Sequence, residues 1–100
     1  MKARGITPNK MELELLITLA PLGWQYVGDG QLIVGGKCPD FWNGDHKLIE
    51  LFGDYWHQGE NPEIRIQHFR DVGYGCLVIW EHELRDEAAV KAKVCAFVET

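Results

Sequence analysis

The feature that most constrains this chain is a short apolar segment with a carboxylate in its interior, Lys47-Leu-Ile-Glu50-Leu-Phe52. In an extended segment, successive side chains point to opposite faces, so Leu48, Glu50 and Phe52 share one face. A charge in so apolar a strand is unfavourable unless it is paired, hydrogen-bonded or bound to a metal ion. The pattern therefore predicts a buried strand in which Glu50 has a specific partner.

A second apolar run, Cys38–Trp42, precedes this strand and contains Asp40. The turn-forming segment Asn43-Gly44-Asp45 separates the two runs and predicts a hairpin. Adjacent strands would bring Asp40 and Glu50 together, and paired carboxylates suit a hard divalent cation. His57 follows on a loop and could act on a water molecule beside the cation. This arrangement is typical of a nuclease active site.

Each carboxylate also has a structural explanation. Asp40 could simply end a turn, a position that aspartate often occupies. Glu50 could form a buried salt bridge with Lys47, Arg65 or Arg70. The two acids together favour a metal site over these separate explanations.

A helix is predicted from Thr7–Asn9 to about Leu19, because asparagine and proline favour helix starts. Its predicted buried face consists of Leu13, Leu15, Leu16, Leu19 and Ala20, and its exposed face includes Glu14 and Thr18. Glu12 falls near the centre of the buried face. It could form a capping box with Asn9, or it could place a carboxylate at the edge of a metal site.

The remaining elements are predicted as strands Trp24–Val27 and Gln31–Val34 in a hairpin, a helix from Asn61 to Gly73, a strand Cys76–Trp80 and a helix from Asp86. The expected core positions of the two helices are Ile66, Phe69, Val72, Val90, Val94 and Phe97. The predicted order is α-β-β-β-β-α-β-α. One hundred residues suit a single domain, residues 1–100, with residues 1–6 as a flexible tail.

The cysteines Cys38, Cys76 and Cys95 have no paired spacing. They are interpreted as reduced thiols of a cytoplasmic protein, with Cys76 and Cys95 in the core and no structural zinc. No apolar run is long enough to span a membrane, so no membrane partner is expected. The net charge of −5 argues against tight DNA binding by the chain alone, because phosphate contacts need Lys and Arg.

Four segments together resemble the very-short-patch-repair endonuclease family: Pro39-Asp40-Phe41, Ile49–His57, Gly73-Tyr74 and Leu77–Glu81. The resemblance covers about residues 7–97 and is strongest to the catalytic domains of phage and intron-encoded homing endonucleases. The wider group is the PD-(D/E)xK nuclease superfamily. The resemblance implies a restriction-endonuclease-like α/β fold in three layers, with a central mixed sheet flanked by helices.

The resemblance also implies a Mg²⁺-dependent endonuclease that cleaves double-stranded DNA and leaves 5′-phosphate ends, with Mn²⁺ as a substitute metal. Asp40 and the backbone carbonyl of Leu51 would hold the ion, with Glu50 as a further candidate ligand. On spacing alone, Asp54 is either another metal or water ligand or an ordinary loop aspartate. Glu12 and Glu50 would position water. The setting would be the cytoplasm of a bacterial or phage-infected cell.

One departure from the wider superfamily affects the general base. That superfamily places a lysine two residues after the glutamate, and this chain has Phe52 there. The resembled family uses histidines instead, and one of them also falls at the Phe52 position. The general-base role is therefore expected of His57 alone, since a histidine side chain ordinarily titrates near neutrality.

Candidate DNA contacts are the aromatic side chains of Tyr55 and Trp56 and the cations of Arg65 and Arg70. Aromatic residues more often seal the core, and that is the preferred interpretation for Trp56. The acidic charge predicts a fused or separate DNA-binding domain, or a second subunit. A homing-type endonuclease is favoured, and the alternatives are a mismatch-directed nickase and a non-catalytic binding module.

Overall fold

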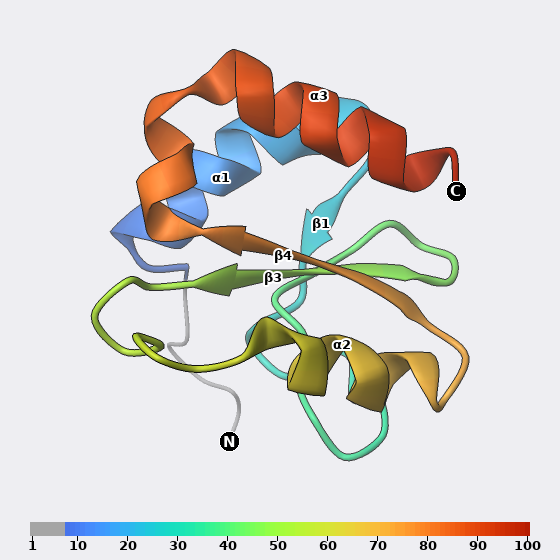
Figure 1. Cartoon of the computed structure of the whole chain (residues 1–100). Helices are drawn as coiled ribbons and strands as arrows, with labels where there is room; N and C mark the ends of the chain where they lie inside the picture. The colour runs from blue at the N-terminus through green and yellow to red at the C-terminus, as the bar shows by residue number, and fades with distance from the viewer. Residues whose placement is uncertain (1–7) are drawn as a thin grey trace.

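The computed structural model describes residues 8–100; the predicted tail at 1–6 and a helix start at Thr7 lie outside that range. A four-stranded mixed sheet lies at the centre (Figure 1). The strands follow in spatial order as β1 (Gln25–Tyr26), β2 (Phe41–Trp42), β3 (Lys47–Phe52) and β4 (Gly75–Trp80). β1, β2 and β3 pair antiparallel, and β4 runs parallel to β3.

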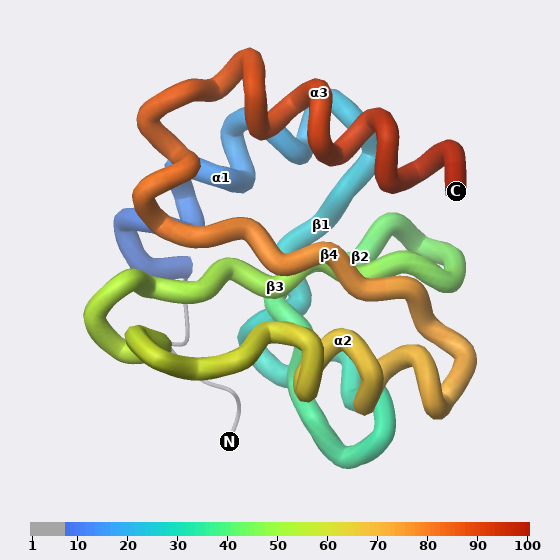
Figure 2. The backbone as a smooth tube through the Cα atoms, in the orientation of Figure 1, coloured from blue at the N-terminus to red at the C-terminus, as the bar shows by residue number. Residues whose placement is uncertain are grey.

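Helices cover both faces of the sheet, which gives three layers (Figures 1 and 2). α1 (Lys10–Leu19) and α3 (Glu87–Val98) lie on one face, and α2 (Pro62–Arg70) lies on the other. Two short 3₁₀ turns, Ala20–Leu22 and Glu81–Arg85, follow α1 and β4. The predicted α/β class with a helix-flanked mixed sheet is confirmed. No helix within residues 8–100 has the length and apolar character required to cross a membrane.

The predicted strand at Gln31–Val34 is wrong, and the observed order has one strand fewer. β1 pairs with β2, so that Gln25 lies opposite Trp42, and the segment after β1 forms only a bridge between Val34 and Lys37. Gly35 and Gly36 have φ angles of 58° and 83°, which reverse the chain directly after Val34. Leu32 and Val34 of this loop therefore pack in the cluster beneath α2, whereas Ile33 is exposed.

The predicted hairpin between β2 and β3 is present. Phe41 lies opposite Ile49 and Trp42 opposite Leu48. Gly44 in the connecting turn has a φ of 87°, a conformation that residues with a Cβ rarely adopt. This register sets the position of the residues just before β2.

Two apolar clusters fill the layers on either side of the sheet. The larger cluster, between the sheet and the pair α1 and α3, contains Leu15, Leu19, Trp24, Phe41, Ile49, Leu51, Ile79, Val90 and Val94. The smaller cluster, beneath α2, contains Val34, Leu48, Phe69 and Cys76. Burying one such aliphatic or aromatic side chain stabilises the fold by roughly 1.5–3 kcal/mol, so these clusters hold the sheet in place.

Several predicted core positions are wrong because the helices are rotated or end early. In α1, Leu13 is exposed while Thr18 is buried, with its hydroxyl donating to Glu87 of α3 at 3.2 Å. Val72 is exposed because α2 ends at Arg70, and Ala20 is exposed because the chain changes to a 3₁₀ turn there. Cys95, also expected in the core, is exposed.

Candidate active site

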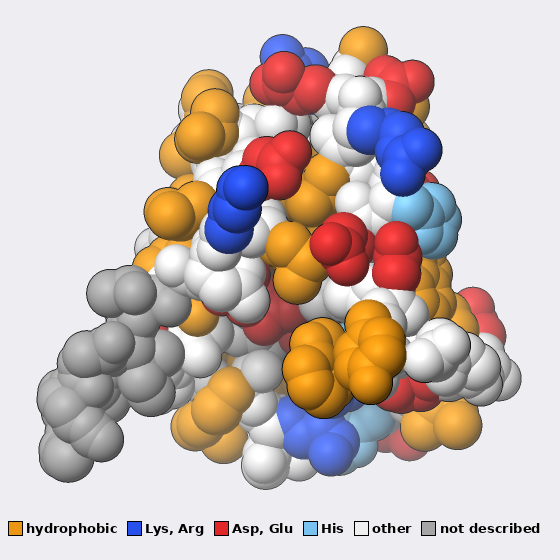
Figure 3. Space-filling model, turned by 90° about the vertical axis from the view of Figure 1, so that its left-hand side faces the viewer, with side chains coloured by type: hydrophobic (Ala, Val, Ile, Leu, Met, Phe, Trp, Pro, Cys, Tyr) orange, Lys and Arg blue, Asp and Glu red, His pale blue; other side chains and the backbone are white. Residues whose placement is uncertain are grey.

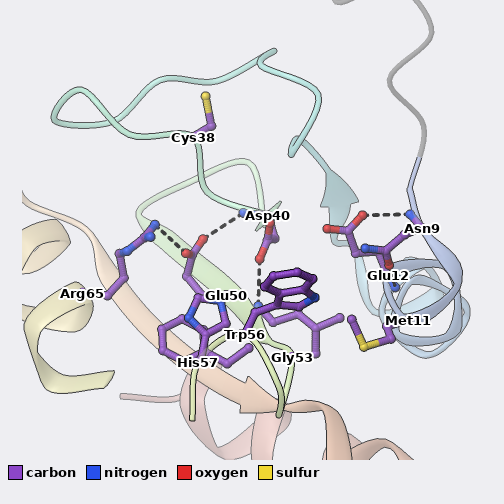
Figure 4. Close-up of a pocket in the computed structure, with 12 residues that line it drawn as sticks. Asn9, Met11, Glu12, Cys38, Asp40, Glu50, Gly53, Trp56, His57 and Arg65 are labelled. Carbon is purple, nitrogen blue, oxygen red and sulfur yellow. Dashed lines mark hydrogen bonds and ion pairs between the residues drawn. The ribbon is translucent and has the colours of Figure 1, made fainter. Parts of the chain in front are cut away.

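Asp40 and Glu50 lie side by side because of the β2–β3 register. Asp40 directly precedes β2, and Glu50 follows Ile49, the partner of Phe41. The backbone N–H of Asp40 donates to Glu50 Oε2 at 3.0 Å, and the N–H of Leu51 donates to Asp40 Oδ2 at 2.8 Å (Figure 4). Each carboxylate is therefore fixed by the backbone of the other strand.

Glu50 is only 3% exposed and has a charged partner on α2. Arg65 Nη1 lies 2.8 Å from Glu50 Oε1, so both oxygens of Glu50 are occupied by donors. The buried salt bridge that the sequence allowed as an explanation for Glu50 is thus present. This salt bridge leaves the contact with Asp40 intact, because Glu50 Oε2 still accepts the hydrogen bond from the Asp40 backbone N–H.

The electrostatics of this pair favour a positive ligand. Burial raises the pKa of the Glu50 carboxyl above its ordinary value, and the neighbouring Asp40 raises it further against the opposing effect of Arg65. Burial also raises the pKa of Asp40; the charge of Glu12 adds to this, while the Leu51 hydrogen bond opposes it. A cation near Asp40 would offset this concentration of negative charge.

Glu12 belongs to a capping box and also lines the same cavity as the acid pair. Its backbone N–H donates to Asn9 Oδ1 at 2.9 Å, and Asn9 N–H donates to Glu12 Oε1 at 2.9 Å. Figure 4 shows its other oxygen on the side that faces Asp40. Burial, together with Glu12, raises the pKa of Tyr26, which keeps that hydroxyl protonated beside the carboxylate. Both explanations given for Glu12 are therefore compatible with the structure.

His57 reaches the cavity from the loop after β3. Its ring stacks on Phe52, with centroids 4.0 Å apart and planes 13° apart. Its Nδ1 lies 2.8 Å from Glu60 Oε1. A carboxylate at Nδ1 favours the tautomer that leaves Nε2 unprotonated and able to accept a proton. Phe52 thus serves as the platform for the histidine ring.

These side chains surround one polar cavity of about 290 Å³ (Figure 4). Its lining includes the acids Glu12, Asp40 and Glu50 together with His57 and Arg65. Figure 3 shows this side of the molecule, where acidic and exposed apolar side chains lie close to one another. The cavity has the size and polarity to take a phosphate group with bound water.

Other predicted site residues lie outside the cavity. Asp54 Oδ1 is paired with His82 Nδ1 at 2.7 Å, and Arg70 contacts Gln67 on the surface of α2 at 3.3 Å. Tyr55 is 70% exposed on the loop after β3. The structure does not bring these side chains to the acid pair.

Trp56 corrects the preferred sequence interpretation. It was expected to seal the core, but it is 78% exposed and lies at the wall of the cavity. The loop after β3 projects away from both apolar clusters, so the indole has no core to enter. Its exposure agrees with the other interpretation, a surface contact.

The sequence pattern did not identify some residues of the site. Glu60 lies in a predicted loop like other acidic residues, and only its separation of three residues from His57 suggests a contact. Cys38 and Met11 line the cavity because of how the loop before β2 and the start of α1 meet. Such contacts depend on tertiary packing rather than on local pattern.

The residues present fit a hydrated Mg²⁺ ion. Within residues 8–100, no preformed group of three or more His, Cys, Asp or Glu side chains could hold a metal. Mg²⁺, however, commonly uses one or two carboxylates and keeps several waters. Asp40 Oδ1 has no hydrogen-bond partner among the described residues, and Leu51 and Glu12 line the same cavity. Glu50 is less suited to direct ligation, because both of its oxygens already accept hydrogen bonds.

Comparisons with known proteins give one clear result. No protein-family model matches the chain, and no curated protein matches it. Among solved structures, it is similar to the catalytic domain of the homing endonuclease I-Bth0305I, with a TM-score of 0.68 and 22% sequence identity. The match covers 87% of this chain and 91% of that domain. At this identity the comparison shows a shared fold.

Proposed function

We propose that this chain is the catalytic domain of a metal-dependent endonuclease that hydrolyses double-stranded DNA. The observation that carries the proposal is the Asp40–Glu50 pair, held by reciprocal backbone hydrogen bonds in a cavity that His57 also lines. The fold shared with a homing-endonuclease catalytic domain supports it. Buried acids beside a histidine suit phosphodiester hydrolysis better than they suit a structural core.

The residues have distinct roles in this proposal. Asp40 and the Leu51 carbonyl would hold Mg²⁺ or Mn²⁺, which when bound supplies positive charge to the scissile phosphate and leaving oxygen. Glu50 keeps the Asp40 backbone in place, and Glu12 orients water at the opposite wall. His57 Nε2 accepts the proton of the attacking water. Hydrolysis of the phosphodiester would then yield a 5′-phosphate and a 3′-hydroxyl.

The glutamate at position 60 supports His57 as the base. Its carboxylate lies on Nδ1, so the imidazolium that forms on proton transfer is stabilised by a neighbouring negative charge. The stacking on Phe52 restrains the ring plane. Both contacts would hold the ring in one orientation before substrate enters.

DNA affinity would come largely from outside this domain. The net charge of −5 leaves few groups for phosphate contacts, so we propose a fused or separate DNA-binding domain or a second subunit. Tyr55 and Trp56 are exposed on the loop beside the cavity and are candidate base contacts, with Arg70 as a candidate phosphate contact. Residues 1–100 in isolation should bind duplex DNA weakly; nanomolar, sequence-specific binding in 150 mM salt, measured by fluorescence anisotropy, contradicts this.

Within this proposal we favour a homing-type endonuclease of the bacterial or phage-infected cytoplasm over a mismatch-directed nickase. One observation favours a different class, a non-catalytic module. Glu50 is fully occupied by Arg65 and the Asp40 backbone, and Phe52 replaces the superfamily lysine. The two classes differ in whether the free oxygen of Asp40 binds metal.

A plasmid assay separates these possibilities. Supercoiled plasmid is incubated with the protein and Mg²⁺, Mn²⁺ or EDTA, and nicked and linear products are measured. Metal-dependent cleavage by the wild-type chain, absent in Asp40→Asn prepared identically, supports the nuclease. Equal products from both preparations indicate a contaminant, and no cleavage with either metal favours the binding module.

A further inference from the structure

The cavity combines several acids with one permanently charged cation. Among the described residues that line it, Arg65 is the one lysine or arginine, and the acids are Glu12, Asp40 and Glu50. A phosphodiester that enters is repelled by the carboxylates. Apart from a bound metal, Arg65 is therefore the group in the lining that attracts it.

The geometry of Arg65 leaves donors available. A guanidinium has five N–H donors, and the one side-chain hydrogen-bond acceptor of Arg65 among residues 8–100 is Glu50, whose Oε1 lies 2.8 Å from Nη1. The side chain is 26% exposed although it reaches a buried acid, so part of the guanidinium remains open to the cavity. Its Cζ lies 5.9 Å from the centroid of the Phe69 ring, which limits its movement.

We propose that Arg65 is a catalytic residue whose remaining N–H groups bind a nonbridging oxygen of the scissile phosphate while Nη1 stays on Glu50. This inference rests on the proposed nuclease function. Charge accumulates on the nonbridging oxygens as the attacking oxygen bonds to phosphorus and the leaving oxygen departs, so a fixed cation acts most strongly at that stage. The planar fork of arginine can serve two acceptors at once, which a lysine ammonium does far less well.

The position of Phe52 agrees with this role. Its ring carries His57, so the strand cannot also present a cation from that position. The positive charge instead enters from α2, on the opposite side of Glu50. His57 therefore reaches the cavity from the loop after β3, and Arg65 reaches it from α2.

Arginine variants separate phosphate binding from a purely structural role. Arg65→Met removes both functions, and its turnover should fall about 10²–10³-fold, as when one transition-state donor is lost. Arg65→Lys keeps a charge for Glu50, so its melting temperature and Mn²⁺ affinity should stay near those of the wild type while kcat still falls. Arg85→Met is the matched control, since Arg85 is exposed at the end of the second 3₁₀ turn and does not line the cavity.

A modified substrate gives a readout that a structural role does not move. Once the wild-type cleavage position is mapped on a duplex, a methylphosphonate there replaces one charged nonbridging oxygen by a methyl group. The wild type should lose rate with the diastereomer that lacks the oxygen bound by Arg65. The cleavage rate of Arg65→Lys should fall little further with that diastereomer, because the contact between Arg65 and this oxygen is already absent.

The outcomes distinguish the two levels of the proposal. Absence of wild-type cleavage with Mg²⁺ and Mn²⁺ overturns the nuclease function and this inference with it. Cleavage by Arg65→Lys at the wild-type rate overturns the role of Arg65 and leaves the nuclease function standing. The same conclusion follows if each diastereomer slows Arg65→Lys by the same factor as it slows the wild type. If Arg65→Met fails to fold, the Arg65→Lys comparison still decides.

Discussion

Ile49 and Glu50, neighbours on opposite faces of β3, are both buried but serve different purposes. On one face, Ile49 is fully buried in the apolar cluster beneath α1 and α3. On the other, Glu50 is 3% exposed and contacts Arg65 and the Asp40 backbone. Burial alone therefore does not distinguish core from site in this molecule. The distinction comes from what each buried group contacts.

The difference has an energetic consequence. Substitution on the apolar face removes packing, which lowers the free energy of unfolding. Burial raises the pKa of Asp40 and Glu50, because the charged carboxylates lose their contact with water. Burying these two charges therefore opposes folding. We expect substitution at Ile49 to lower mainly stability and substitution in the Asp40–Glu50 pair to lower mainly catalysis.

The largest effect should come from Asp40→Asn, which should abolish metal-dependent plasmid cleavage. The amide keeps an acceptor for the Leu51 N–H but loses the charge that would hold Mg²⁺. Because burial raises the pKa of Asp40 in the folded chain, the folded state binds the proton more tightly than the unfolded state does. Wild-type stability should therefore fall as pH rises from the unfolded to the folded pKa.

Thermal melts from pH 4 to pH 8, recorded without metal, provide the stability half of this test. Asp40→Asn should show a smaller pH-dependent loss, because Glu50, whose pKa is also raised by burial, still contributes to it, and the variant should melt at or above the wild-type temperature at neutral pH. A large fall in its melting temperature would mean that Asp40 is part of the structural framework rather than of a catalytic site.

His57→Ala should lower the single-turnover cleavage rate about 10²–10⁴-fold, the usual contribution of a general base. Metal affinity should change little, because the ring contacts Phe52 and Glu60 rather than the acid pair. Raising the pH should restore part of the rate, since hydroxide can replace the missing base. His82→Ala, which removes a histidine paired with Asp54 outside the cavity, is the control. Wild-type rates in His57→Ala would exclude it from the mechanism.

Ile49→Ala tests the other face of the same strand. It should cost about 2–5 kcal/mol of unfolding free energy, measured by urea denaturation, because it leaves a cavity in the larger apolar cluster. At a temperature where the variant is folded, its cleavage rate should stay close to that of the wild type. A selective loss of activity without loss of stability would show that the two faces are coupled.

Much of this division could be predicted from the sequence, because local patterns determine it. A glutamate between Ile49 and Leu51 demands a partner, and Asn43-Gly44 specifies the turn that delivers Asp40 to it. The helices after Asn61 and Asp86 follow from their caps, whose side chains accept hydrogen bonds from Glu63 and Ala89 N–H groups. These features need only short-range chemistry.

The rest depended on tertiary contacts. The apolar run Gln31–Val34 is a loop because β1 found its partner in β2, a choice that alternation cannot predict. Arg65 was one of several possible partners for Glu50, and only the placement of α2 selects it. Trp56 is exposed because its loop leaves the sheet, whereas its aromatic character alone favoured the core.

The smallest expected effect, at Glu12, decides between two roles that the structure leaves combined. Glu12→Gln keeps an oxygen to accept the Asn9 N–H, so the start of α1 and the melting temperature should be preserved. It removes the charge at the cavity wall, so cleavage should slow, though less than in the Asp40 and His57 variants. Asn9→Ala does the reverse: it loses the cap, at about 0.5–2 kcal/mol, and retains the carboxylate. If Glu12→Gln lowers only the cleavage rate and Asn9→Ala lowers only the melting temperature, Glu12 has both roles, in helix capping and in catalysis. Wild-type cleavage by Glu12→Gln would assign its carboxylate to the helix alone.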